Sequence, residues 1–70
     1  MLTITNKYIA GDLVTDDDVE FVNDVEITGD FSAKSCYAHK SIYVHKNYTS
    51  SRWDKVGGAQ DVGGSQEVGG

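Results

Sequence analysis

The clearest pattern in the chain is an apolar residue that recurs at every sixth position. Val19, Val25 and Phe31 are six residues apart, and a second apolar residue follows each of them two positions later. Near the end of the chain, Val56 and Val62 keep the same spacing, and two glycines follow each valine. An apolar–polar–apolar triplet is typical of a short strand with one buried face. The pattern therefore predicts a series of short strands separated by corners.

A six-residue unit is too short for a β-hairpin, but it suits one side of a coil of parallel strands. The backbone groups of each strand then pair with the coils above and below, about 4.8 Å away. Three such units close a triangle of about 18 residues. We therefore predict an all-β fold, a short parallel β-helix of about three triangular coils over residues 13–70. Residues 1–12 are predicted to form an N-terminal strand or cap, and residues 1–70 a single domain.

The six-residue spacing is interrupted once, after Ala33. The next apolar pairs fit best at Cys36 with Ala38 and at Ile42 with Val44, which requires one five-residue unit, as a β-bulge would provide. With the pattern shifted by this five-residue unit, four rings point outward, those of Tyr37, His39, Tyr43 and His45. Without the shift the same rings would point into a narrow core, where their polar atoms are costly to bury.

Two local features bear on the predicted strands. Thr15 and Asp18 could form the capping box of a one-turn helix over residues 15–23, but the six-residue column through Val19 and Phe21 favours a strand there. The paired glycines that follow Val56 suit tight corners, and we expect positive φ angles at such glycines.

Charge is distributed unevenly along the chain. Residues 11–30 carry eight carboxylates and no lysine or arginine, whereas residues 31–55 hold four lysines and one arginine against Asp54 alone. The net charge is −5, which disfavours general affinity for nucleic acid and favours a basic protein surface as the partner. The residues expected to contact that partner are Asp12, Asp16, Asp17, Asp18, Glu20, Asp24 and Glu26. A second column of Lys34, Lys40, Lys46 and Arg52, beside Tyr37 and Tyr43, is an alternative phosphate-binding stripe.

The sequence predicts no catalytic residues, no metal site and no cofactor. Cys36, His39 and His45 could be considered as zinc ligands, but six-residue spacing places the two histidines on neighbouring sides of a coil. The Asp16–Asp18 run lacks the spacing of an EF-hand loop, and the glycine pairs lack the lysine of a phosphate-binding loop. A single cysteine allows no internal disulfide, and the start of the chain lacks the features of a signal peptide, so we expect a cytoplasmic protein.

The segment DVEITGDFSAKSCYAHKSIYVHKN and the VGG units after it resemble the β-helices of bactofilins and related hexapeptide proteins. The chain is also similar in kind to small phage inhibitors, among them anti-CRISPR proteins with a pentapeptide-like coil. The second resemblance implies a phage-borne, non-enzymatic inhibitor whose negative surface occupies a DNA-reading surface on its target. The first implies the alternative function, a structural β-helix scaffold that assembles through its coil ends.

Overall fold

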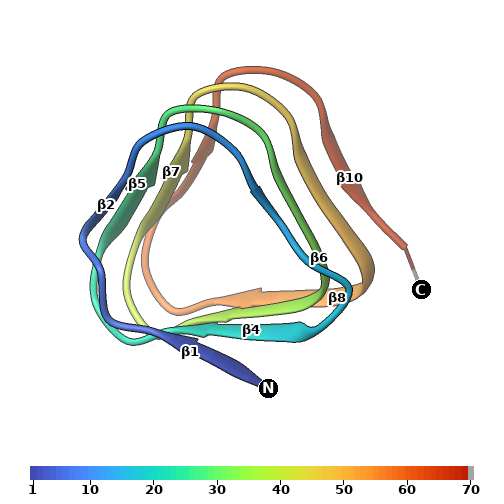
Figure 1. Ribbon diagram of the computed structural model, residues 1–70, viewed down its shortest axis with the longest axis horizontal. Coiled ribbons are helices and arrows are strands. Elements are labelled where there is room, and N and C mark those ends of the chain that lie inside the picture. The colour runs from blue at the N-terminus through green and yellow to red at the C-terminus, as the bar shows by residue number, and fades with distance from the viewer. Residues whose placement is uncertain (70) are drawn as a thin grey trace.

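The structure is a computed structural model, and it describes residues 1–69. The chain winds as a β-solenoid of parallel strands stacked in about four turns, triangular when viewed along the stack (Figure 1). Residues 1–69 contain no helix, and residues 18–21 form a strand, so the one-turn helix considered for residues 15–23 is absent. The predicted all-β parallel β-helix is confirmed.

The ten strands within residues 1–69 are short, except for two that bend around a corner. They are β1 (Leu2–Ile4), β2 (Tyr8–Ile9), β3 (Leu13–Val14), β4 (Asp18–Phe21), β5 (Val25–Ile27), β6 (Phe31–Ala38), β7 (Ile42–Val44), β8 (Tyr48–Val56), β9 (Gln60–Val62) and β10 (Gln66–Val68).

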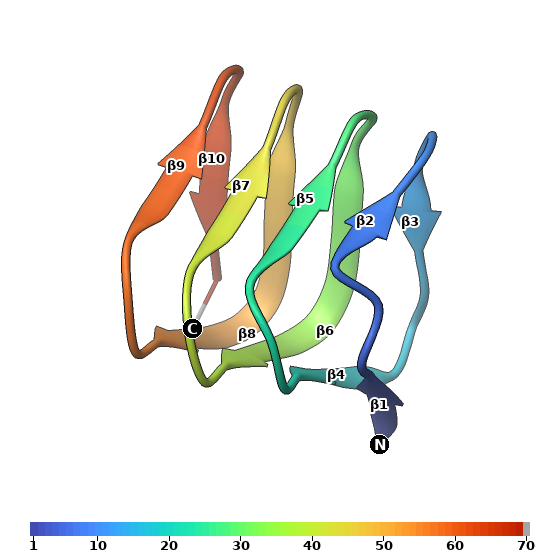
Figure 2. The same ribbon diagram turned by 90° about the vertical axis from the view of Figure 1, so that its left-hand side faces the viewer.

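Three sides make up the triangle. The first side contains β1, β4 and the C-terminal halves of β6 and β8. The second side is the sheet β2-β5-β7-β9, which faces the viewer in Figure 2. The third side contains β3, the N-terminal halves of β6 and β8, and β10. We call the corners between these sides the first (residues 5–7, 22–24, 39–41 and 57–59), the second (10–12, 28–30, 45–47 and 63–65) and the third (16–17, 34 and 51–52).

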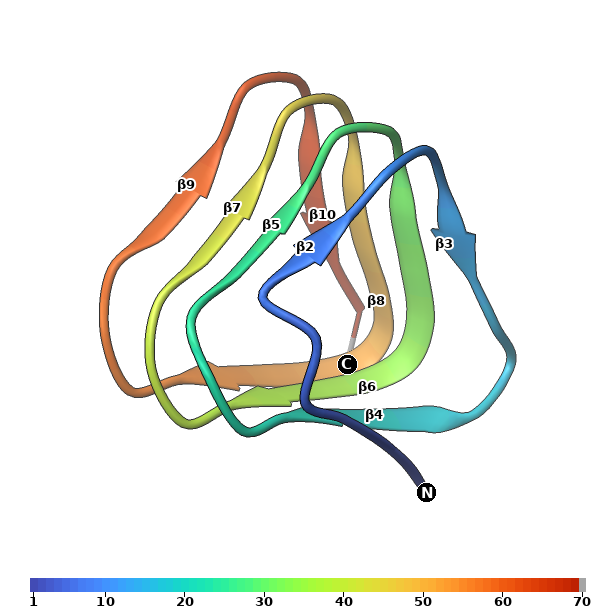
Figure 3. The same cartoon turned by 60° about the vertical axis from the view of Figure 1, so that its left-hand side comes forward.

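Strand partners lie one coil apart in the sequence, but the coils differ in length. Leu13 pairs with Phe31, and Phe31 pairs with Tyr48, so the coil that begins at Phe31 is one residue shorter than the coil before it. The shorter coil arises at the third corner, where the register shifts between Ala33 and Ser35 and Lys34 alone makes the turn. This is the position at which the sequence predicts a five-residue unit. β6 and β8 run through the third corner, which joins the third and first sides into one sheet (Figure 3).

The inward positions form a continuous apolar core along the axis of the solenoid. The predicted pairs Cys36 with Ala38 and Ile42 with Val44 are fully buried. Three tilted aromatic rings follow one another through the centre, with 5.6 Å between the centroids of Phe21 and Phe31 and 5.2 Å between those of Phe31 and Tyr48. Rings at such distances add to the stabilisation from their buried area.

The last coil is different, because polar side chains take three of its inward positions. Asp54 pairs with Cys36 of the coil before it, and in the same way Gln60 pairs with Ile42 and Gln66 with Tyr48. The carboxylate of Asp54 accepts hydrogen bonds from the Tyr48 hydroxyl at 3.2 Å and the Gln60 amide at 2.9 Å. The core therefore ends in a polar layer at the C-terminal end of the stack.

The solenoid has about four coils, not the predicted three, because the first twelve residues take part in it. β1 pairs with β4 and β2 pairs with β5, so these residues form two sides of a first coil and are not a separate cap. The inner residues of this coil, Ile4, Ile9 and Leu13, pack against the core but stay partly exposed. The N-terminal end of the stack is thus apolar inside.

The paired glycines serve close packing between coils. Among residues 1–69 only Gly11 has a positive φ, of 91°, so the expected positive φ at the VGG glycines is wrong. Gly63 instead passes so close to the coil before it that an added Cβ would lie 2.2 Å from the carbonyl oxygen of His45, and at Gly57 it would lie 2.4 Å from that of His39. Only a residue without a side chain fits there.

We expect Gly63→Ala to destabilise the protein by about 1–3 kcal/mol, because the new methyl group must displace a backbone carbonyl. The measurement is the midpoint of urea unfolding. Ser65→Ala, an exposed change two residues away, is the matched control and should shift the midpoint little. Equal stability of Gly63→Ala and the wild type would show that the contact between the two coils is looser than described.

Candidate functional site

The outer face of the second side carries an alternation of tyrosine and carboxylate along the stack. The outward positions of its four strands are paired in one continuous ladder, and they hold, in order, Tyr8, Glu26, Tyr43 and Asp61. Neighbouring strands are about 4.8 Å apart, so Glu26 and Asp61 are separated by about 10 Å with Tyr43 between them. Tyr8 and Tyr43 are 56 % and 40 % exposed, large values for aromatic rings.

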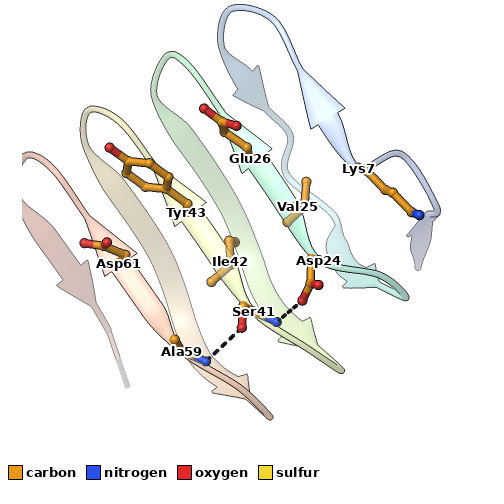
Figure 4. A pocket seen from close by; sticks show the side chains of 9 residues that line it. All are labelled: Lys7, Asp24, Val25, Glu26, Ser41, Ile42, Tyr43, Ala59 and Asp61. Atoms are coloured by element: carbon orange, nitrogen blue, oxygen red, sulfur yellow. Dashed lines mark hydrogen bonds between the residues drawn. The ribbon is translucent and has the colours of Figure 1, made fainter.

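A shallow groove of about 390 Å³ runs beside this ladder, along the first corner. Figure 4 shows Asp24, Glu26 and Asp61 around it, with the Tyr43 ring between the last two and Lys7 at its N-terminal end. Three carboxylates against one lysine give the groove a negative charge. Its remaining lining comes from Val25, Ser41, Ile42 and Ala59.

The floor of the groove is fixed by a ladder of side-chain hydrogen bonds. Asp24 Oδ1 accepts the backbone N–H of Ser41 at 3.0 Å, and Ser41 Oγ accepts that of Ala59 at 3.1 Å. Each of these short polar side chains therefore satisfies a backbone donor in the next coil, as such residues do at turns. The Asp24 carboxylate is held in place by the fold before any partner binds.

The wall of the groove is also fixed, through His45. The Nε2 atom of His45 lies 2.6 Å from Glu26 Oε2, and its ring stacks on that of Tyr43 with 4.3 Å between centroids. The first side repeats this arrangement. His39 Nε2 lies 2.5 Å from Glu20 Oε2, and the centroids of the His39 and Tyr37 rings are 4.4 Å apart. All four rings point outward, as the five-residue unit predicts.

Carboxylates beside an exposed tyrosine ring form a surface that suits a cation. Guanidinium and ammonium groups make charge-assisted hydrogen bonds to carboxylates and are attracted to the face of an aromatic ring. The groove is open along the whole stack, so it suits a side chain presented by another macromolecule better than an enclosed small molecule.

The seven residues predicted to contact a partner are divided among different surfaces. Asp24 and Glu26 lie in the groove, whereas Glu20 lies on the first side. Asp12 is at the second corner, where its Oδ1 accepts the backbone N–H of Asp30 at 2.7 Å. The other three, Asp16, Asp17 and Asp18, lie at and beside the third corner.

The carboxylates at the corners also have structural partners. The Asp12 contact begins a ladder at the second corner that continues from Asp30 to the N–H of Asn47 and from Asn47 to that of Ser65. At the third corner, Asp17 Oδ1 accepts the N–H of Asp18, and its Oδ2 lies 3.5 Å from the N-terminal amine. Part of the acidic character of the sequence is thus explained by the coil corners.

The alternative phosphate-binding stripe is not a single surface, because six residues span one side of the triangle. Lys40 lies at the first corner and Lys46 at the second, and only Lys34 and Arg52 share the third corner. Residues 1–69 also contain no group of three or more histidine, cysteine and acidic side chains that could hold a metal ion. His39 and His45 lie at different corners, and Cys36 is buried in the core.

Two groove residues, Lys7 and Asp61, and Tyr8 in the ladder beside the groove are missing from the sequence prediction. The signal that could have found them is the length of one coil, which separates Glu26 from Tyr43 and Tyr43 from Asp61. A search at the spacing of one side alone does not connect these positions.

Comparison with known proteins adds nothing to this geometry. No protein-family model, curated protein or solved structure matches the chain. No helix long and apolar enough to cross a membrane occurs within residues 1–69. The groove is therefore the basis for the functional proposal.

Proposed function

We propose that this protein is a non-enzymatic binding protein whose acidic groove takes basic side chains of a partner protein. The observation that carries the proposal is the placement of Asp24, Glu26 and Asp61 around the exposed ring of Tyr43. Hydrogen bonds within the fold hold the first two carboxylates in position. A partner cation would therefore meet a preorganised site, which lowers the entropic cost of binding.

A narrower form of the proposal takes the partner to be a DNA-reading surface and the protein to be a phage-borne, anti-CRISPR-like inhibitor acting in the host cytoplasm. Its support is the charge of residues 11–30, which hold eight carboxylates and no lysine or arginine. A surface that binds nucleic-acid phosphates is rich in lysine and arginine, and an acidic protein can compete for it. Assignment to the hexapeptide-repeat proteins is likewise a proposal, which rests on the six-residue spacing.

The groove predicts salt-sensitive binding of a short, extended peptide of alternating arginine and lysine. We expect Glu26→Gln combined with Asp61→Asn to weaken binding at least about tenfold, because both carboxylates beside Tyr43 are neutralised. The measurement is fluorescence anisotropy of the labelled peptide at low and high salt.

The matched control is Asp16→Asn combined with Glu67→Gln, which removes the same charge from exposed positions outside the groove. This control should bind within about twofold of the wild type, the effect of long-range charge alone. Equal losses in the two double variants would mean that the peptide reads the total charge and that the groove is not the site. Charge reversal at Asp16, Asp17 and Asp18 tests the narrower form of the proposal, which predicts that it abolishes binding of a DNA-reading partner.

The alternative function is a scaffold that stacks through its coil ends. It is favoured by the first coil, whose inner residues Ile4, Ile9 and Leu13 are partly exposed and whose strand edge is unpaired on one side. The C-terminal end is less suited to stacking, because Asp54 and Gln60 make the last coil polar inside. Growth into filaments needs both ends, so this geometry favours at most pairing through the N-terminal end.

A further inference from the structure

The first side carries a second set of exposed charged and aromatic residues, outside the groove. Two residue ladders run along the stack on this side. One holds Asp18, Ser35 and Trp53, of which Ser35 is buried, and the other holds Thr3, Glu20, Tyr37 and Lys55. Between β4 and β8, both ladders therefore run from a carboxylate on β4 through an uncharged residue on β6 to a tryptophan or a lysine on β8.

The third corner beside this side repeats the same polarity. Asp16 and Asp17 lie level with β4, Lys34 with β6, and Arg52 with β8. The surface formed by the first side and the third corner is thus acidic toward the N-terminal end of the stack and basic toward the C-terminal end. We call this surface the bipolar face; it contains Asp16, Asp17, Asp18, Glu20, Lys34, Tyr37, Arg52, Trp53 and Lys55.

The basic residues of the bipolar face are not neutralised within the chain. In the described part of the chain, the ion pairs within 4.0 Å use the N-terminal amine, His39 and His45 as cations, and none uses Arg52 or Lys55. Lys55 instead lies over the ring of Tyr37, with Nζ 5.7 Å from the centroid. Trp53 is 45 % exposed next to these charges. An exposed tryptophan beside an arginine is a composition typical of protein interfaces.

We propose that the bipolar face binds the same face of a second copy of this chain, in a two-fold symmetric dimer. A two-fold axis parallel to the strands and level with β6 reverses the direction of the stack. It places Glu20 of each copy opposite Lys55 of the other, and brings the two Tyr37 rings together at the centre. The same two-fold rotation places opposite charges together at the acidic and the basic end of the face. The face is therefore complementary to itself, as an isologous interface requires.

The size of the face is consistent with a weak dimer. The Cα trace measures 26 × 23 × 20 Å, so one side offers roughly 400–500 Å² per copy, near the lower limit for a specific interface. We therefore expect a dissociation constant of about 10–500 μM at low salt, increasing as salt screens the charges. None of the residues of the bipolar face lines the groove, so the proposal stands independently of the proposed function.

Charge exchange between Glu20 and Lys55 tests the dimer. Glu20→Lys and Lys55→Glu should each weaken self-association at least about tenfold, since each homodimer then places like charges opposite one another. A mixture of these two variants should form a heterodimer, and the double variant should dimerise again. Sedimentation equilibrium gives the association constants, and emission from Trp53, the only tryptophan, reports its burial.

Lys46→Glu at the second corner makes the same charge change as Lys55→Glu outside the face, and it should leave dimerisation unchanged. Circular dichroism melting shows that each variant is folded. The proposal is overturned if the wild type stays monomeric at about 1 mM and low salt, or if neither the mixture nor the double variant restores association. Assembly beyond the dimer would also overturn it and would support stacking through the coil ends.

Discussion

Phe31→Ala is expected to cost about 3–5 kcal/mol of folding stability, enough to unfold much of the protein at 37 °C. Phe31 is 1 % exposed, and its ring lies between those of Phe21 and Tyr48 in the centre of the stack. A domain of this length has a free energy of unfolding of roughly 4–10 kcal/mol, so the loss is a large fraction of the total. Urea unfolding followed by circular dichroism and by Trp53 fluorescence measures it.

Tyr43→Ala is the matched control for this prediction. It removes another aromatic ring, but one that is 40 % exposed and packs on the His45 ring at the surface. We expect a loss of no more than about 1 kcal/mol, since little buried area is given up. Equal losses for the two variants would mean that the three aromatic rings of the core are not the main source of stability.

Stability is expected to fall steeply as the pH rises above 9. Burial raises the pKa of the Cys36 thiol from 9.0 to about 11, against the lowering effect of its hydrogen bond with Tyr48 and with a smaller increase from the nearby Asp54 carboxylate. Burial also raises the pKa of the Tyr48 hydroxyl well above its usual range, with a further contribution from its hydrogen bond to Cys36. Both groups are fully enclosed in the core.

The sign of the effect follows from which state loses its protons first. Between pH 9 and 11 the thiol ionises in the unfolded chain but stays protonated in the folded chain, so the unfolded state is favoured. The stability from Cys36 is fully present below pH 9 and is lost as the pH rises to 11, by about 2–3 kcal/mol. Urea unfolding at intervals from pH 7 to 11, under reducing conditions, measures this decline.

Cys36→Ala separates the thiol from the other groups that titrate in this range. The variant starts less stable because it lacks a buried sulfur atom, but its decline should begin closer to pH 10, where Tyr48 ionises in the unfolded chain. The folded wild type should also react slowly with thiol reagents at pH 8, because the thiolate is the reactive form. A decline with the same onset and slope in both proteins would exclude Cys36 as its cause.

The core could be predicted from the sequence because each inward position depends on local alternation. The pairs Phe31 with Ala33 and Cys36 with Ala38 show the shift of phase directly, and the structure buries all four residues. Alternation cannot give the same result for the first coil. Ile9 follows Ile4 by five positions, so the six-residue spacing is lost before Leu13. For that reason the sequence alone predicts only an N-terminal strand or cap there, and not two sides of a coil.

The groove and the bipolar face could not be predicted, because they depend on which coils lie next to each other. The coil that separates Glu26 from Tyr43 is one residue shorter than the coil that separates Tyr43 from Asp61. The difference is set at the third corner, where Lys34 alone makes a turn that two residues make in the neighbouring coils. An error of one residue in this count would turn an outward ladder toward the core.

Every strand pairs with a strand from a neighbouring coil, and this affects how the protein can fold during synthesis. During synthesis, β4 must leave the ribosome before β1 has a partner, and β10 completes the third side last. Each newly made coil can add to the coils already formed, since it contacts only its neighbour. The same arrangement allows evolution to lengthen or shorten the protein by whole coils, because duplicating or deleting one would leave the pairing of the others unchanged.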